Sequence, residues 1–178
     1  FFKMKNILLT LSILISACAS AQVAIGKATV SSPAVSLEFY DNADNTRGII
    51  LPWVTSTAAV TGAVNGTIVY NTADRKVYVK YASGWRDLSV DNTGTVTTTL
   101  QDSLTDQDTA KVLIGGDPST DTTPGILVLA DTNKAMVLPK VASPHLNIVN
   151  PSPGMMVYDT TKKQLAVFNG TVWSFWKP

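Results

Sequence analysis

Few side chains in this sequence could perform catalysis, and their spacing forms no catalytic motif. The 178 residues contain a single histidine, His145, and a single glutamate, Glu38. A nucleophilic triad needs a histidine held beside a nucleophile and a carboxylate, and no Gly-x-Ser-x-Gly elbow is present to supply that nucleophile. A glycosidase pair would have to come from aspartates in loops, where aspartate usually forms turns. We therefore expect a protein that is not an enzyme.

The metal-ligating residues are equally sparse. One histidine and one cysteine, Cys18, do not suffice for a zinc site. Oxygen ligands for calcium could come from Asp102, Asp106 and Asp108, or from the segment 115–121. Neither group matches the spaced aspartates and closing glutamate of an EF-hand. We expect no cofactor, with a structural calcium ion as the alternative.

Tryptophans give the one ligand hypothesis, because indole rings can stack on sugars. Trp85 and Trp173 close two similar stretches of sequence, and this recurrence favours packing in a core. Trp53 and Trp176 have no tryptophan counterpart. A variable, exposed tryptophan is a better interface or ligand residue than a repeated one, so we predict that Trp53 and Trp176 contact a partner or surface glycans.

The chain is a tandem repeat. Residues 66–85 and 154–173 carry one pattern, namely glycine, an apolar run, Tyr-(Asn/Asp)-Thr, a polar turn, a second apolar run and tryptophan. Such self-similarity indicates two copies of one structural unit. Earlier segments match as well, since 23–26 resembles 112–115 and 48–54 resembles 135–141.

Apolar runs of strand length, without a sustained helical period, predict an all-β fold. We expect two homologous small antiparallel β modules, sandwich-like or fibre-like, at residues 22–90 and 112–178. A Thr/Asp-rich linker at 91–111 joins them, because it has too few apolar groups to fold alone. Short helical turns fit only at 56–64 and 143–149. The sequence leaves open whether the modules pack together.

The hairpin turns have their own chemistry. Asn71 and Asp159 occupy the same position of the repeat. Each can fold a side-chain oxygen onto the backbone N–H two residues further on, which explains why Asn and Asp interchange there.

Residues 1–21 have the features of a secretory signal peptide. Lys3 and Lys5 precede the apolar run 7–15, and small residues follow as far as Ala21. This run is too short to span a bilayer. Cleavage after Ala21 would leave Gln22 first, whereas Ile15-Ser-Ala-Cys18 resembles a lipobox in which Cys18 is acylated. Either route predicts an extracellular or cell-surface protein without a transmembrane helix in the mature chain.

Charge excludes one class of partner. The sequence has 14 Lys and Arg against 13 Asp and Glu. No basic patch stands out, so we expect no nucleic-acid binding.

The segments Ala21–Gly26, Leu51-Pro52, Gly66–Thr72 and Gly84-Trp85 together resemble the repeat of exported, tail-fibre-like surface proteins of Bacteroidetes-type bacteria. This resemblance implies secretion and a β-rich, self-associating module, and it implies no activity. It also implies O-glycosylation at Asp-(Ser/Thr) motifs, for which the candidates are Ser103, Thr109 and Thr122.

We therefore expect a non-enzymatic structural subunit of a surface fibre or filament, or an adhesin, that self-associates through β-strand edges. The candidate donated strand is Val23, Ala24, Ile25 and Gly26. Two alternatives are open. One is a carbohydrate-binding module that uses Trp53 and Trp176, and the other is an outer-membrane lipoprotein subunit anchored at Cys18.

Overall fold

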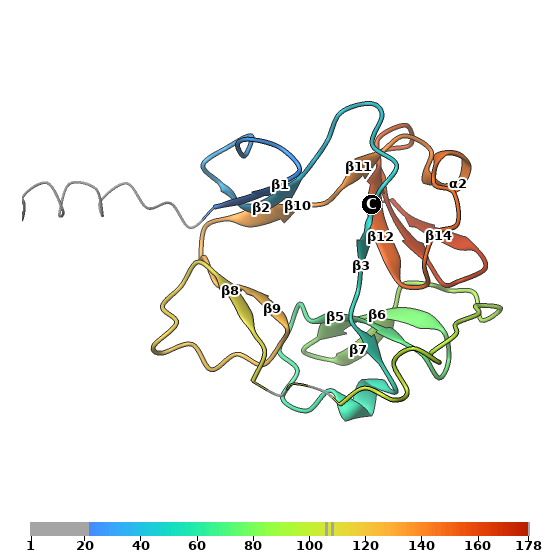
Figure 1. Cartoon of the computed structure of the whole chain (residues 1–178), viewed down its shortest axis with the longest axis horizontal. Helices are drawn as coiled ribbons and strands as arrows, with labels where there is room; N and C mark the ends of the chain where they lie inside the picture. Colours follow the sequence, from blue (N-terminus) through green and yellow to red (C-terminus); the bar gives the residue numbers. More distant parts are fainter. Residues whose placement is uncertain (1–21, 106, 108, 178) are drawn as a thin grey trace, which may run out of the picture.

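The computed structural model describes residues 22–105, 107 and 109–177, and almost all of its regular structure is β, as the sequence predicts (Figure 1). Every element of the first repeat recurs in the same order in the second. The first repeat contains β1 (Val23–Ile25), β2 (Val35–Phe39), β3 (Ile49–Ile50), β4 (Trp53–Val54), the 3-10 turn η1 (Thr57–Ala59), β5 (Ile68–Asn71), β6 (Lys76–Tyr81) and β7 (Gly84–Asp87). The second contains β8 (Val112–Ile114), β9 (Leu127–Leu129), β10 (Ala135–Val137), β11 (Lys140–Val141), α2 (Pro144–Asn147), β12 (Met155–Asp159), β13 (Gln164–Phe168) and β14 (Trp173–Trp176).

The repeated pattern forms a three-stranded antiparallel meander in each copy. β5, β6 and β7 pair in order, and β12, β13 and β14 do the same. The predicted turns are confirmed: the Asn71 side-chain oxygen accepts from the Ala73 amide at 2.9 Å, and that of Asp159 accepts from the Thr161 amide at 2.9 Å. The short helical segments η1 and α2 also lie inside the two predicted windows.

Each repeat also contains two parallel pairings. β1 pairs with β2 and β8 with β9, while β4 pairs with β5 and β11 with β12. Pro52 and Pro139 stand at strand ends, as expected for residues without an N–H. Their carbonyl oxygens accept from the amides of Tyr70 and Tyr158, each at 2.9 Å, which fixes the parallel approach.

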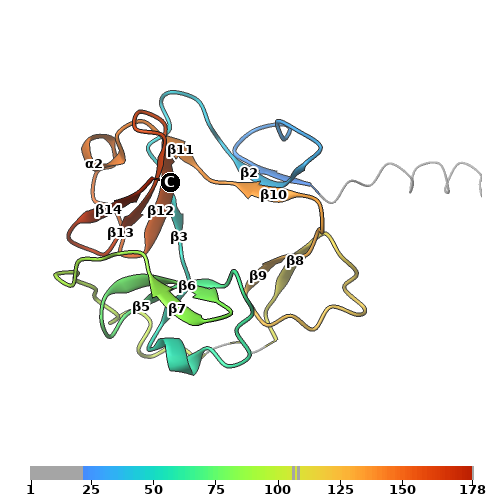
Figure 2. The same cartoon turned by 180° about the vertical axis from the view of Figure 1, so that it is seen from behind.

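The two repeats share sheets. β10 of the second repeat pairs in parallel with β2 of the first, and β3 of the first repeat pairs antiparallel with β12 of the second. Both views show β2 beside β10 and β3 beside β12 (Figure 2). The modules therefore pack together, the point that the sequence left open.

The larger hydrophobic core lies between the repeats. Its buried residues are Leu51, Tyr70, Val77 and Leu88 from the first repeat and Met156 and Val167 from the second. The fully buried Tyr70 hydroxyl donates to the Asn169 carbonyl oxygen at 2.8 Å, which joins the repeats by a polar contact as well. Neither repeat completes this core alone.

A smaller core belongs to the second repeat. It contains Val141, Ile148, Met155, Val157, Ala166 and Phe168. β12 is consequently buried on both faces, since Met156 faces the shared core and Val157 faces this one.

The segment 91–111 forms no strand among its described residues. Its first part is fixed against both repeats, because Arg75 donates to the Gly94 carbonyl oxygen at 3.1 Å and the Asn169 amide group donates to Asp91 at 3.1 Å. In the described part of the chain, no helix is long and apolar enough to cross a membrane.

Candidate functional site

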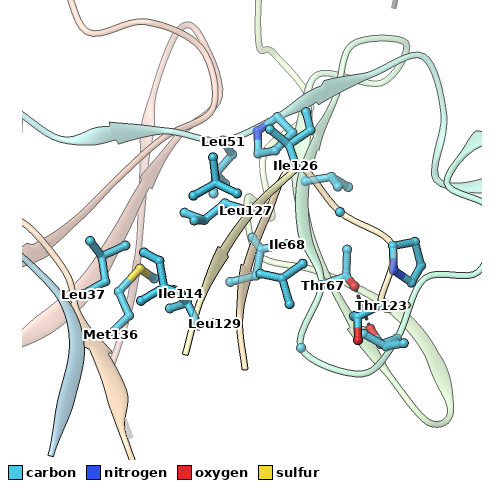
Figure 3. Close-up of a pocket in the computed structure, with 18 of the residues that line it drawn as sticks. Leu37, Leu51, Thr67, Ile68, Ile114, Thr123, Ile126, Leu127, Leu129 and Met136 are labelled. Atoms are coloured by element: carbon cyan, nitrogen blue, oxygen red, sulfur yellow. Dashed lines mark hydrogen bonds between the residues drawn. The ribbon is translucent and has the colours of Figure 1, made fainter. Parts of the chain in front are cut away.

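An apolar cavity of about 1170 Å³ lies where the sheets of the two repeats meet. Strands of all four sheets line it, including β2, β3, β5, β9 and β10. The close-up shows Leu37, Ile68, Ile114, Leu129 and Met136 pointing toward one space, with Thr67 and Thr123 at one end (Figure 3). The lining therefore consists mainly of apolar side chains and contains few groups that could act as acids, bases or metal ligands.

Much of this lining is exposed. Ile126 is 64% exposed, Ile50 53% and Leu127 48%. The exposed large apolar residues that line the cavity are Val23, Ile25, Ile50, Val64, Val112, Ile126 and Leu127. Contiguous apolar surface of this kind marks interaction sites on soluble proteins.

The cavity is also bordered by an unpaired strand edge. The Val112 amide donates to the Ile126 carbonyl oxygen and the Ala130 amide donates to the Ile114 carbonyl oxygen, so residues 126 and 130 face β8. Backbone groups alternate along a strand, and those of Leu127 and Leu129 therefore point to the opposite edge. No strand pairs with that edge among the described residues. Backbone groups left in this way are a template for another strand.

An ionic cluster supports the three-stranded sheet beside the cavity. The buried Glu38 lies 3.1 Å from the Lys27 ammonium and accepts from the Ser31 amide at 2.5 Å. Asp41 binds Lys27 at 3.0 Å and Lys140 of the second repeat at 3.2 Å. These bonds tie β2 to its own loop and to the other repeat.

The surroundings of Glu38 keep its carboxyl group charged. Burial acts to raise the pKa of Glu38, but the Ser31 amide and the Lys27 ammonium outweigh it and hold the pKa below its usual value. Hydrogen bonds from Lys27 and Lys140 likewise lower the pKa of Asp41. These charged groups pair with one another across the loop and the repeat boundary, so the cluster has a structural role.

The predicted assembly strand is β1, in which Val23, Ala24 and Ile25 pair in parallel with β2, and Gly26 follows directly. β1 is the outer strand of its sheet. No strand of the described part of the chain pairs with its second edge. Exchange of the whole strand would require the pair with β2 to break.

Trp53 and Trp176 are half-buried, and the ring nitrogen of each donates across the repeat boundary. Trp53 donates to the Pro153 carbonyl oxygen at 3.0 Å and packs against Tyr70, with ring centroids 6.0 Å apart. Trp176 donates to the Leu88 carbonyl oxygen and lies 5.4 Å from the Arg86 guanidinium. Both indoles already serve contacts between the repeats.

The recurring tryptophans are not equivalent in space. Trp173 packs on the smaller core, with its ring 5.2 Å from that of Phe168. Trp85 is half-buried and joins neither core.

The predicted modification sites are accessible where the structure describes them. Ser103, Thr109 and Thr122 are exposed, whereas Cys18 lies outside the described residues. Asp106 and Asp108 of the calcium hypothesis also lie outside them. Within the described part of the chain, no three His, Cys, Asp or Glu side chains form a group that could hold a metal ion.

The nearby polar candidates have ordinary partners. Asp117 accepts from the Ser119 amide at 2.8 Å, and Asp121 pairs with Lys111. His145 packs edge-on against Phe175, with ring centroids 5.7 Å apart.

Comparison with known proteins adds one match. Residues 117–177 are similar to the protein family described as a phage tail like trimerisation region. The match spans β9 to β14, the greater part of the second repeat. No curated protein and no solved structure matches the chain. Together with the β fold, this similarity suggests a fibre-like structural protein.

Proposed function

We propose that the chain is an exported, non-enzymatic structural subunit of a bacterial surface fibre or adhesin, and that it self-associates as a trimer. The observation that carries this proposal is the similarity of residues 117–177 to a trimerisation region. These residues are also the ones that present the open edge of β9 and the exposed Ile126 and Leu127.

Physical chemistry supports association over ligand binding. The lining of the cavity is apolar and partly exposed, so a partner with apolar strands would gain roughly 25 cal/mol for each Å² removed from water. Unpaired strand edges supply the direction of approach. A chain without disulfides in its described part also gains most of its resistance to unfolding from such burial.

The test is where the protein is found and in what form. The chain, with residues 1–21 retained, is expressed in a Gram-negative host, and intact cells are labelled with an antibody for electron microscopy. The proposal predicts surface label on fibrous material that added protease removes. Label confined to the cytoplasm, or a protein that resists protease until cells are lysed, would contradict it.

The intact mass of the purified protein decides the processing questions. Cleavage after Ala21, acylation at Cys18 and glycans on Ser103, Thr109 or Thr122 each give a distinct mass. A mass equal to residues 22–178 alone would leave the export proposal standing and remove the lipoprotein and glycoprotein variants.

A further inference from the structure

The two repeats of one chain meet through a directional interface. The first repeat contributes β2 and β3, and the second contributes β10 and β12. By position in the repeat, β9 is the counterpart of β2, β10 of β3, and β12 of β5. The two sides of the interface are therefore different surfaces, which is the head-to-tail arrangement that generates rings or filaments.

Each repeat consequently has one half of the interface unused. In the second repeat the unused half is the outer edge of β9, which corresponds to the edge of β2 that receives β10. The registers make the match specific, because Val23 is opposite Leu37 in the first repeat and Val112 is opposite Leu127 in the second. Leu127 is thus the counterpart of Leu37, whose partner is Met136.

The first repeat has the complementary unused half on β3. The Leu51 amide donates to the Gly154 carbonyl oxygen, so the backbone groups of Leu51 and Ile49 face β12. Those of Gly48 and Ile50 therefore point to the outer edge. Their counterparts in the second repeat are Ala135 and Val137, which lie on either side of Met136, the residue opposite Leu37.

A glycine and a tyrosine give independent support for these two unused surfaces. Gly154 packs on Tyr70, and a Cβ atom at Gly154 would lie 2.8 Å from the Cβ of Tyr70. The counterpart glycine, Gly66, has nothing within 4 Å of such an atom, and the counterpart tyrosine, Tyr158, is half-buried where Tyr70 is fully buried. Gly66 and Tyr158 thus lack the contact that Gly154 and Tyr70 make within the chain, and a neighbouring repeat could supply it.

We propose that a second copy of this chain occupies these edges, with β9 of one copy pairing in parallel with β3 of the next. The register places Leu127 opposite Ile49 and Val128 opposite Ile50, and Tyr158 packs over Gly66. The pairing buries Ile50 and Leu127, two of the most exposed apolar residues of the cavity. This inference rests on the proposed self-association and specifies the surfaces that perform it.

The interface between copies is not an exact duplicate of the one within the chain. A Cβ atom on Gly48 would lie 2.6 Å from the Val157 side chain, and Ala135 takes the position of Gly48 in the second repeat. β10 therefore approaches β5 of the next copy less closely at that point, and the pairing of β9 with β3 provides the main hydrogen bonds.

Disulfide trapping tests the register. The double variant Ile50→Cys with Val128→Cys places two cysteines opposite each other on strands about 4.8 Å apart, within disulfide reach. Under mild oxidation we expect a reducible ladder up to three covalently joined chains. Each single variant controls for Cys18, and Ile50→Cys with Ile126→Cys is a matched pair two residues out of register.

The outcomes separate the inference from the function on which it rests. Joined chains from the opposite pair, and at least five-fold fewer from the shifted pair, support the inference. A disulfide within one chain, or equal yields from both pairs, overturns it. If light scattering shows trimers but no joined chains form, the inference fails and self-association stands. If every sample is monomeric, both fail.

Discussion

At the scale of the residue, specific side-chain hydrogen bonds join the two repeats in addition to their shared sheets and core. Tyr70 is the clearest example, since it belongs to the larger core and bonds through its hydroxyl to Asn169 of the other repeat. Trp53 of the first repeat and Trp176 of the second each donate a hydrogen bond to a carbonyl oxygen of the other repeat. Loss of one such contact weakens the whole molecule, because the core is shared.

Replacement of Tyr70 by phenylalanine tests this view. The variant retains the ring but leaves the Asn169 carbonyl oxygen without its donor. We expect the free energy of unfolding to fall by about 1–3 kcal/mol, the usual cost of an unpaired buried polar group. Urea denaturation followed by tryptophan fluorescence measures it. Tyr81→Phe is the control, because Tyr81 is 47% exposed, and an equal loss there would contradict the assignment.

Alkaline pH gives a second test at Tyr70. Burial raises the pKa of Tyr70 to about 12 from its usual value near 10. Between these values the unfolded chain loses the proton while the folded chain keeps it, so deprotonation favours unfolding. The free energy of unfolding should be unaffected by this group below pH 10 and should fall from pH 10 to 12.

The Tyr70→Phe variant should lose a smaller part of its unfolding free energy over this range. Part of the dependence will remain, since burial followed by the hydrogen bond to Asp74 also raises the pKa of Tyr78. Identical pH profiles for the variant and the parent would show that Tyr70 is not buried as described.

At the scale of the element, much of the meander could be predicted from the sequence. Alternation of apolar residues located β5, β6, β12 and β13, and the chemistry of Asn71 and Asp159 located their turns. The information for these features is local, because a hairpin brings together residues close in sequence.

The parallel pairings could not be predicted in this way. β2 and β10 are separated by most of the chain, and nothing in Val35–Phe39 indicates which of several apolar runs will pair with it. The open edge of β9 was missed for the same reason. Alignment of the repeats identifies β9 as the counterpart of β2, but only the structure shows that β2 has two neighbours and β9 one.

Asp159 provides a prediction about the hairpin. One side-chain oxygen accepts from the amides of Ser143, Thr161 and Lys162, at 3.1, 2.9 and 3.2 Å. Asp159→Ala should lower the free energy of unfolding by about 1–3 kcal/mol, because these amides lose their acceptor. Asp159→Asn keeps that oxygen, and asparagine is native at the equivalent position 71, so it should cost less than half as much in thermal or urea unfolding. Equal costs would refute this role of the acceptor.

At the scale of the whole molecule, two small repeats form one body with a shared core and leave a cavity bordered by open edges. A lone module of this size is marginal in stability. Within the chain, the shared strands and core compensate for the small size of each repeat. The counterpart edges that remain unpaired are available for contacts between chains. The sequence could predict self-association in general terms, but only the fold distinguishes used from unused edges.

Charge placed on the open edge should block assembly. Ile50→Lys puts an ammonium group where the next copy is expected to bury an apolar side chain, and lysine is a common means of blocking strand edges. We expect at least a ten-fold higher protein concentration for half-assembly, with unchanged circular dichroism. Val149→Lys is the matched control, because Val149 is 81% exposed and lies outside the cavity. Similar effects of both changes would mean that β3 is not at the interface.

The most direct test of self-association is the molar mass of the purified, processed protein in solution. Size-exclusion chromatography with multi-angle light scattering, over a hundred-fold range of concentration, measures it without an assumption about shape. Our account predicts three times the mass of one chain, or larger assemblies built from that unit. A mass of one chain at every concentration would contradict it.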